Sequence, residues 1–223
     1  MIYKAVIFDL FETLITEWGH KKYTKSEMSS DLGIESDKFN RYWDEKEEDR
    51  YLGAISFTDS LRFVCEKCEK PIEDSLLAAM TEKRVVTKSA CFDYVHPAVY
   101  QLLEHLKAAR LPLAIVSNCS AEEVNRIRQS RLAPYFDPIL LSCEIKMQKP
   151  DIHIYMEAAK LLKVSTNECL FVGDGGSHEL QGAKAAGMTA LQAKWYTNQL
   201  PHKRDSIPGF LTAEHPLDVL AKL

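Results

Sequence analysis

Three short apolar segments of the chain each run into polar side chains, and this pattern constrains the fold more than any other feature. The segments are 5–8, followed by Asp9, then 113–116, followed by Ser117 and Asn118, and 169–173, followed by Asp174. Consecutive apolar residues of this number are typical of a strand that is buried on both faces. Because the carboxyl ends of parallel strands meet at one edge of an open sheet, we expect these polar side chains to gather there.

Helix and strand patterns alternate along most of the remaining chain. Helices are predicted over 98–109, 121–130, 151–162 and 179–186, and further strands over 138–142 and 188–193. This alternation predicts an α/β fold with a doubly wound parallel sheet. Near the end of the chain, 201–208 is predicted to be a loop and 217–223 a short closing helix.

The segment from about 15 to 92 differs because it contains no convincing strand. Helices are predicted over 26–32, 36–50, 58–67 and 72–84, with Gly33, Gly53 and Pro71 between them. A helical block is therefore expected to interrupt the sheet-forming part directly after its first strand. The predicted division is a core formed by 1–14 and 93–223 and a helical domain formed by 15–92.

Composition argues against several classes of function. The chain has a net charge of −4 and no block of basic residues, so no nucleic-acid binding is expected. No apolar run approaches the roughly 20 residues that span a bilayer, so no membrane insertion is expected. The N-terminus lacks the pattern of a signal peptide, and six scattered cysteines are expected to be reduced thiols, which together favour a cytoplasmic protein. Cys65 and Cys68 lack the further ligands that a zinc site needs.

Taken together, the polar strand ends resemble the four motifs of the haloacid dehalogenase superfamily of hydrolases, in the same order and over essentially the whole chain. The matching residues are Asp9 and Thr13, then Ser117 and Asn118, then Lys149 in Lys-Pro-Asp, and finally Asp174 and Glu179 in Gly-Asp-Gly-Gly-Ser-His-Glu. The resemblance implies a Rossmann-like core whose helical insertion is a cap of the small type 1 kind.

The resemblance also implies how the catalytic residues would act. Asp9 would be the nucleophile, and Thr13 would orient it or the attacking water. Lys149 would neutralise Asp9 and bind the substrate's phosphoryl oxygens. Ser117 and the amide of Asn118 would donate hydrogen bonds to the same oxygens.

A metal site is implied as well. A carboxylate that attacks a phosphoryl group must overcome mutual negative charge, and Mg²⁺ with its preference for oxygen ligands reduces that repulsion. Asp9, Asp174 and the main-chain carbonyl of Phe11 would hold the ion. Glu179 would serve as a direct or water-mediated outer ligand.

Phe11 departs from the usual pattern of the superfamily's phosphatases. The residue two places after the nucleophile is usually a second Asp, which protonates the leaving oxygen and then activates water. The side chain of phenylalanine has no acidic proton to donate. Glu12 is the nearest substitute acid, but successive side chains diverge in direction, so its part depends on the three-dimensional structure.

The helical cap is expected to select the substrate. The candidate contacts are Arg41, Tyr42, Trp43, Arg50 and Tyr51. Arg50 is the first choice for a substrate-binding residue because it precedes the turn at Gly53. A small cap of this kind favours small soluble substrates, and the sequence leaves a monomer and a homodimer equally open.

The predicted function is a Mg²⁺-dependent phosphatase of a small phosphorylated metabolite that acts through an aspartyl-phosphate on Asp9. One alternative is a metal-free 2-haloacid dehalogenase, because that branch has an aromatic residue at the position of Phe11 and a halide leaves without a proton. That branch lacks an aspartate like Asp174. The other alternative is a catalytically weak binding or regulatory protein on the same scaffold.

Overall fold

The computed structural model describes residues 3–199 and 204–223, and a six-stranded parallel sheet forms its centre. The strands are β1 (Ala5–Phe8), β2 (Leu113–Ser117), β3 (Ile139–Leu141), β4 (Cys169–Gly173), β5 (Thr189–Ala193) and β6 (Leu211–Ala213). Their order across the sheet is β3-β2-β1-β4-β5-β6, so the chain adds strands on one side of β1 and then on the other. This doubly wound order confirms the predicted fold class and makes β1 and β4 neighbours where the direction of winding changes.

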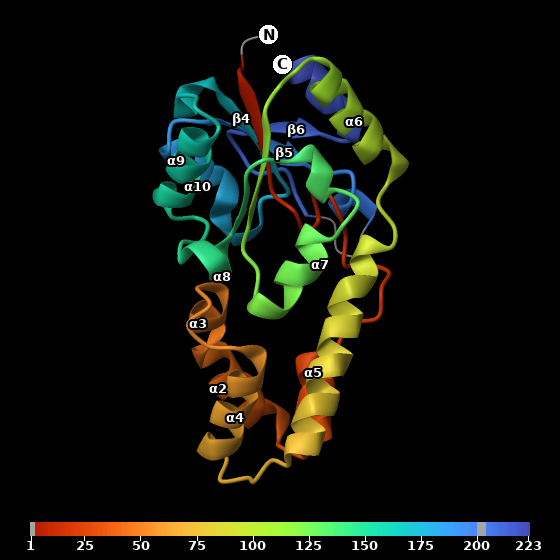
Figure 1. The fold of residues 1–223 in the computed structure, drawn as a ribbon, viewed down its shortest axis with the longest axis vertical. Helices are drawn as coiled ribbons and strands as arrows, with labels where there is room; N and C mark the ends of the chain where they lie inside the picture. The colour runs from red at the N-terminus through yellow and green to blue at the C-terminus, as the bar shows by residue number, and fades with distance from the viewer. Residues whose placement is uncertain (1–2, 200–203) are drawn as a thin grey trace.

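Helices cover both faces of the sheet, as Figure 1 shows. Val6 and Phe8 of β1 belong to the apolar cluster on the face that α6 (Pro97–Ala108) covers. Ala5 and Ile7 belong to the cluster on the other face, with α9 (Ile152–Leu161) and α10 (Glu179–Ala185). Successive side chains of a strand point to opposite faces, so a central strand of a parallel sheet covered on both faces needs apolar residues at every position. This explains the apolar run at 5–8, which forms β1.

A block of five helices lies between β1 and α6 in the sequence. The helices are α1 (Lys25–Leu32), α2 (Ser36–Glu45), α3 (Glu47–Tyr51), α4 (Phe57–Lys67) and α5 (Asp74–Ser89). Figure 1 shows them at the lower end of the molecule, with α5 leading back towards the sheet. They bury an apolar cluster of their own, in which Phe39 stacks on Trp43 with 5.6 Å between ring centroids. The domain boundaries at 15 and 92 stay predictions.

Local sequence explains where these helices begin and end. Thr24 and Glu27 form a capping box at the start of α1, and Gly33 ends that helix with φ +59°. The single helix predicted over 36–50 is instead two helices, because the backbone leaves helical geometry at Lys46, with φ −105° and ψ 12°. This break changes the direction in which the residues of α3 face.

Several short elements differ from the prediction. The region predicted as one helix over 121–130 is a 3-10 turn, η2 (Ala121–Glu123), followed by α7 (Val124–Arg128), and the closing helix is a 3-10 helix, η7 (Pro216–Lys222). Strand β6 and the short α8 (Ser142–Ile145) were not predicted. The three residues of β6, Leu-Thr-Ala, do not form an apolar run as the Ile-Leu-Leu of β3 does, and a single helical turn has no readable periodicity. Of the loop predicted over 201–208, residues 201–203 lie outside the described part of the chain.

The helical block contacts the sheet-forming part at two places. At the first, Lys146, just after α8, donates from Nζ to the carbonyl oxygen of Gly53 at 2.8 Å. A side chain at residue 53 would bring a Cβ within 2.2 Å of the Cys143 carbonyl oxygen, so this contact requires glycine. At the second, Arg84 of α5 pairs through Nε with Glu122 of η2 at 3.1 Å. Among residues 3–199 and 204–223, no helix has the length and apolar character to cross a membrane.

Candidate active site

Asp9 lies at the carboxyl end of β1 and is almost completely buried, with 5% of its surface exposed. Its main-chain N–H donates to the Val172 carbonyl oxygen at 2.9 Å, which holds the following loop against β4. Thr13 Oγ1 donates to Asp9 Oδ2 at 3.0 Å, and Lys149 Nζ donates to Oδ1. Each carboxylate oxygen of Asp9 therefore has a fixed direction, which a positioned nucleophile requires.

Lys149 is buried between two carboxylates. Its Nζ donates to Asp9 and, at 2.5 Å, to Glu179 Oε2. Burial alone would lower the pKa of this ammonium, but the charges of Asp9 and Glu179 raise the pKa above its ordinary value. Lys149 therefore carries its positive charge across the whole neutral range of pH.

Asn118 holds the main chain of Lys149. Its Oδ1 accepts from the Lys149 N–H at 2.8 Å, and its Nδ2 donates to the Lys149 carbonyl oxygen at 2.9 Å. The side-chain amide of Asn118 is thus occupied, so the predicted donation to a substrate would fall to its main-chain N–H. Ser117 ends β2 at the same edge, but its side chain is buried and its Oγ makes a long 3.5 Å contact with the Asn118 carbonyl oxygen.

Asp174 and Glu179 form a group of three buried carboxylates with Asp9. One oxygen atom from each residue lies within 4.8 Å of the other two. Burial, and after it the charge of Asp9, raises the pKa of Asp174 and raises the pKa of Glu179 to about 8. A divalent cation would relieve this crowding of negative charge, and carboxylate oxygens are the ligands that Mg²⁺ prefers. The three residues therefore fit a magnesium site.

A second cation reaches the acidic group from the segment before β6. Arg204 donates from Nη1 to Asp174 Oδ2, and the Gly176 N–H donates to Asp174 Oδ1 at 3.0 Å. Sequence reasoning assigned this segment to a loop and gave Arg204 no role. Its only signal in the sequence is a basic residue in a polar stretch, which is ordinary for a surface.

Glycine is required in the loop that carries Asp174. A Cβ on Gly173 would lie 2.2 Å from Glu179 Oε1, so only glycine lets the Glu179 carboxylate pass beneath the loop. Gly175 has φ +95°, a conformation that glycine adopts without strain. The buried Gln192 of β5 donates to the Asp174 carbonyl oxygen at 3.2 Å and fixes the loop from the side of the sheet.

Two aromatic residues after β5 support the loop that follows Asp9. The Trp195 indole N–H donates to the Thr13 carbonyl oxygen at 2.8 Å, and the Tyr196 hydroxyl donates to the Leu14 carbonyl oxygen at 3.4 Å. The loop's position thus depends on residues far away in sequence. No local pattern of the sequence could have indicated this.

The side chain of Phe11 is half-buried in the apolar cluster on the α6 face, and its ring centroid lies 5.3 Å from Lys88 Nζ. Glu12 lines the same pocket as Asp9, and burial raises the pKa of its carboxyl group. Its oxygens accept hydrogen bonds from Thr16 Oγ1 at 2.5 Å and from the Glu17 N–H at 2.9 Å. Glu12 therefore holds its own loop together. Whether the Phe11 carbonyl binds metal stays a prediction.

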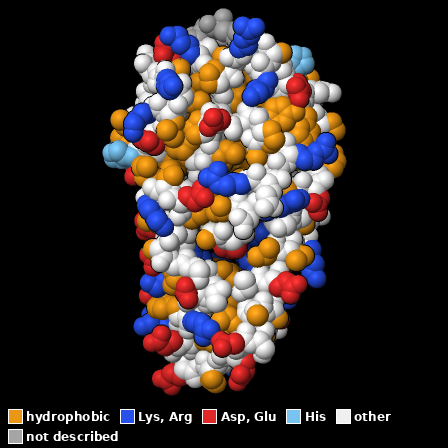
Figure 2. Space-filling model, in the orientation of Figure 1, with side chains coloured by type: hydrophobic (Ala, Val, Ile, Leu, Met, Phe, Trp, Pro, Cys, Tyr) orange, Lys and Arg blue, Asp and Glu red, His pale blue; other side chains and the backbone are white. Residues whose placement is uncertain are grey.

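A pocket of about 230 Å³ opens above the carboxylates, between them and the helical block. Figure 2 shows charged side chains of both signs where the two parts of the molecule meet. Besides the residues already described, the charged and hydroxyl-bearing lining residues are Glu17, Tyr51, Arg84, Lys88, Ser120, Glu123 and Ser177. The pocket is therefore strongly polar, as a site for a small charged molecule would be.

The position of Arg50 differs from the prediction. Arg50 does not line this pocket, because its guanidinium group lies 3.9 Å from the Trp43 ring centroid and donates to the Trp43 carbonyl oxygen at 2.9 Å. The next residue, Tyr51, faces the pocket instead. Arg50 instead lines a neighbouring pocket with Tyr51, Arg84 and Ser120, so its contact with substrate stays a prediction. Of the other candidates, Arg41, Tyr42 and Trp43 do not line the pocket either.

Arg84 and Lys88 face the pocket from α5, and sequence reasoning missed both. They are four residues apart and therefore share one face of the helix. That spacing was readable, but the helix was predicted to end at 84, one turn before Lys88. Lys88 Nζ pairs with Glu17 at 2.7 Å and with Glu123 at 3.0 Å.

A comparison with known protein families matches residues 3–187 to the model of the haloacid dehalogenase-like hydrolases. The chain belongs to this family. The match spans β1 to the end of α10 and so includes every motif residue described above. Membership of the haloacid dehalogenase-like hydrolases confirms the resemblance that the motifs indicated.

Relatives within this family differ in activity. The chain is 24% identical over 217 residues to a glyceraldehyde 3-phosphate phosphatase of Methanopyrus kandleri, covering 93% of this chain and 91% of that protein. It is 26% identical over 205 residues to bifunctional epoxide hydrolase 2 of Sus scrofa, covering 86% of this chain but only 36% of the pig protein. (S)-2-haloacid dehalogenases also match. The relatives therefore establish a hydrolase and leave its reaction open.

A solved structure of the same family has the same fold. The 2-haloacid dehalogenase of Pseudomonas syringae pv. Tomato DC3000 superposes with a TM-score of 0.65 at 23% identity, covering 99% of both chains. At this level of identity the similarity establishes the architecture of the haloacid dehalogenase-like hydrolase and nothing about its substrate.

Proposed function

We propose that this hydrolase is a Mg²⁺-dependent phosphatase of a small phosphorylated metabolite, acting through an aspartyl-phosphate on Asp9. The observation that carries the proposal is the group of three buried carboxylates, Asp9, Asp174 and Glu179, with oxygens within 4.8 Å of one another. A carboxylate does not need other carboxylates beside it in order to act as a nucleophile. Neighbouring carboxylates raise the free-energy cost of burying its charge. The arrangement is understandable if a divalent cation balances the charge.

Asp9 and Asp174 would hold the Mg²⁺, with the main-chain carbonyl of Phe11 as a third ligand and Glu179 close by. The bound ion would supply charge neutralisation for the approach of an anionic nucleophile to an anionic phosphoryl group. Glu179 also accepts a hydrogen bond from Lys149, so it links the ammonium to the metal site. The fixed ammonium of Lys149 adds a second positive charge that needs no reorganisation during reaction.

In the first step, an oxygen of Asp9 attacks phosphorus, the bond between phosphorus and the ester oxygen breaks, and that oxygen leaves with the bonding electron pair. Thr13 and Lys149 keep the Asp9 carboxylate in the direction of attack. In the second step, water attacks the aspartyl-phosphate, which releases inorganic phosphate and restores the Asp9 carboxylate.

Because Phe11 has no acidic proton, this mechanism lacks the general acid that usually protonates the leaving oxygen. General acid–base catalysis contributes about 100- to 10,000-fold to such reactions, so esters with poor leaving groups should react slowly. Glu12 is the nearest carboxyl group in sequence, but its own loop occupies both of its oxygens. We therefore propose substrates whose leaving group departs as a stable anion, such as aryl or acyl phosphates.

A 2-haloacid dehalogenase is the second candidate, favoured by the aromatic residue at position 11. In that reaction Asp9 would displace halide from carbon, and water would hydrolyse the resulting ester. Asp174 would have no part in it, which is why we rank this candidate lower. A weakly catalytic binding protein is the third, and the positioned nucleophile argues against it.

Hydrolysis of 4-nitrophenyl phosphate and of 2-chloropropionate, each with Mg²⁺ and with a chelator, tests the proposal. Release of phosphate that requires Mg²⁺ and is lost in Asp9→Asn and in Asp174→Asn is the expected result. Release of halide in the presence of chelator, unchanged in Asp174→Asn, would establish the dehalogenase instead. Tight binding of a phosphate ester without turnover would favour the binding protein.

We also propose that the protein works in the cytoplasm as a monomer or a homodimer. All six cysteines are free thiols, which suits a reducing compartment.

A further inference from the structure

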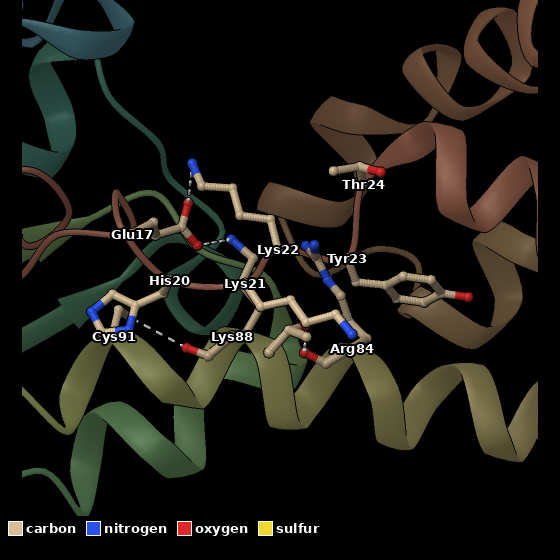
Figure 3. Close-up of a pocket in the computed structure, with 10 residues that line it drawn as sticks. Glu17, His20, Lys21, Lys22, Tyr23, Thr24, Arg84, Lys88 and Cys91 are labelled. Atoms are coloured by element: carbon tan, nitrogen blue, oxygen red, sulfur yellow. Dashed lines mark hydrogen bonds and ion pairs between the residues drawn. The ribbon is translucent and has the colours of Figure 1, made fainter. Parts of the chain in front are cut away.

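A second pocket, of about 120 Å³, lies beside the first, where the segment after β1 passes α5. Figure 3 shows lining side chains from both parts of the chain, with Lys22 and Lys88 pointing toward Glu17. Four of them are cationic, Lys21, Lys22, Arg84 and Lys88, and one is a carboxylate, Glu17. We call it the hinge pocket, because its walls come from the segment that leads into the helical block and from the helix that leads out.

The hinge pocket and the active-site pocket share three lining residues, Glu17, Arg84 and Lys88. These side chains form the partition between the two spaces. For one molecule to meet both spaces, its far end would have to pass between these three side chains to reach the lysines of the linking segment. The reacting end and the far end would meet separate sets of cations.

The cations of the hinge pocket differ in how far their charges are already balanced. Lys88 is paired with Glu17 and Glu123. Arg84 pairs through Nε with Glu122, and among the described residues its two terminal nitrogens make no hydrogen bond. Lys22 reaches Glu17 only at 4.0 Å.

Lys21 is exposed and has no hydrogen-bond or ion-pair partner in the part of the chain that the structure describes. The pocket thus combines a space of about 120 Å³ with the ammonium of Lys21 and the terminal nitrogens of Arg84, whose donors are not used within the described part of the chain. An oxyanion is the ligand that such donors recognise, and the guanidinium fork of Arg84 suits its geometry.

We propose that the hinge pocket binds a second anionic group of the substrate, a carboxylate or a phosphate, which makes the natural substrate a small phosphomonoester with two anionic groups. This inference rests on the proposed phosphatase function. Lys21, Lys22 and the terminal nitrogens of Arg84 are the recognition groups, and they distinguish doubly anionic esters from neutral ones of equal size.

The test compares 3-carboxyphenyl phosphate with 3-carbamoylphenyl phosphate, two esters of nearly the same shape that differ in one charge. A charge-assisted hydrogen bond favours kcat/KM for the carboxylate ester by about tenfold or more. Lys21→Gln and Lys22→Gln should each reduce this ratio several-fold, because each removes a positive charge that only the carboxylate ester can use. Lys25→Gln is the matched control, because its ammonium lies outside the pocket and pairs with Asp44.

The outcomes separate this inference from the proposed function. Hydrolysis of both esters at equal kcat/KM would overturn the inference and leave the phosphatase intact. If neither ester is hydrolysed, calorimetric binding of the two esters to Asp9→Asn gives the same comparison without turnover, and equal affinities would again overturn the inference. Substituting 1,3-phenylene bisphosphate for the carboxylate ester shows whether the second anion is better recognised as phosphate.

Discussion

The side-chain amide of Asn118 binds both main-chain groups of Lys149, accepting at 2.8 Å from the N–H and donating at 2.9 Å to the carbonyl oxygen. This pair joins the loop after β2 to the loop before α9, 31 residues further along the chain. Asn118 thereby fixes the direction from which the Lys149 ammonium approaches Asp9. The structure therefore gives Asn118, which the sequence matched to substrate binding, a positioning contact with Lys149.

Asn118→Ala should lower kcat for an aryl phosphate by about 10- to 100-fold, because a displaced Lys149 no longer meets the phosphoryl oxygens. The loss of two partly buried hydrogen bonds should also lower the free energy of unfolding by about 1–3 kcal/mol. Steady-state kinetics and urea unfolding measure the two effects. Asn125→Ala, at an exposed position of α7, is the control. Wild-type kcat in Asn118→Ala would refute the positioning role.

Phe11→Asp should restore the missing acid. We expect hydrolysis of an alkyl phosphate to increase by about 100-fold or more, while hydrolysis of 4-nitrophenyl phosphate changes little. The measurement is kcat/KM across a series of esters with leaving groups of increasing pKa. In the wild type the rate should fall steeply along the series, and in Phe11→Asp the slope should flatten. An equally steep slope in both proteins would mean that another group already protonates the leaving oxygen.

Arg204→Gln should tighten the binding of a divalent cation. Arg204 pairs with Asp174 Oδ2, and a metal ion must compete with it for that carboxylate. Because the arginine side chain is 41% exposed, the pair is worth at most about 1 kcal/mol, which corresponds to an increase of up to about fivefold in affinity. Titration of Mn²⁺ followed by electron paramagnetic resonance measures binding without turnover. Arg62→Gln, whose partner is the exposed Asp74, should leave the affinity unchanged.

The ion pair between Lys88 and Glu17 should make stability depend on pH. Burial would raise the pKa of Glu17, but Lys88 at 2.7 Å more than offsets this and holds the pKa below the ordinary value of 4.5. The pair therefore stabilises the folded protein above pH 4.5, and that stabilisation is lost as the pH falls through the lowered pKa. Removing Lys88 takes away the main opposition to the effect of burial on the Glu17 pKa and leaves only the smaller effects of Lys22 and Arg84.

The difference in Tm between wild type and Lys88→Met should be largest near pH 7 and shrink towards pH 4. Calorimetry with chelator across this range measures it, with Lys25→Met at an exposed ion pair as the comparison. A difference that stays constant with pH would show that Lys88 contributes through packing alone.

The part of the site that lies directly at strand ends was predictable from sequence. Asp9 and Asp174 directly follow short apolar runs, and a buried carboxylate in that position has few structural explanations. The sheet order then brings them together, because β1 and β4 pair in parallel. The local sequence therefore shows which polar residues stand at the strand ends, and the order of the strands in the sheet decides which of them lie close together.

The residues that sequence reasoning missed, or placed behind another candidate, depend on contacts over long distances or on the direction of a short helix. Tyr51 faces the pocket and Arg50 does not, because the backbone breaks at Lys46 and turns the following helix. Arg204 reaches Asp174 from a segment next to β6, which is too short to recognise. Such placements follow from tertiary packing and leave no periodic signal in the sequence.

The hydrogen bond between the Trp195 indole and the Thr13 carbonyl oxygen spans 182 residues of sequence. A polypeptide still being synthesised would present Asp9 long before the indole that braces the loop after it. Until β5 and the residues beyond it have joined the sheet, the loop after Asp9 lacks this support. The order of synthesis therefore makes the bracing of this loop one of the last steps in completing the candidate active site.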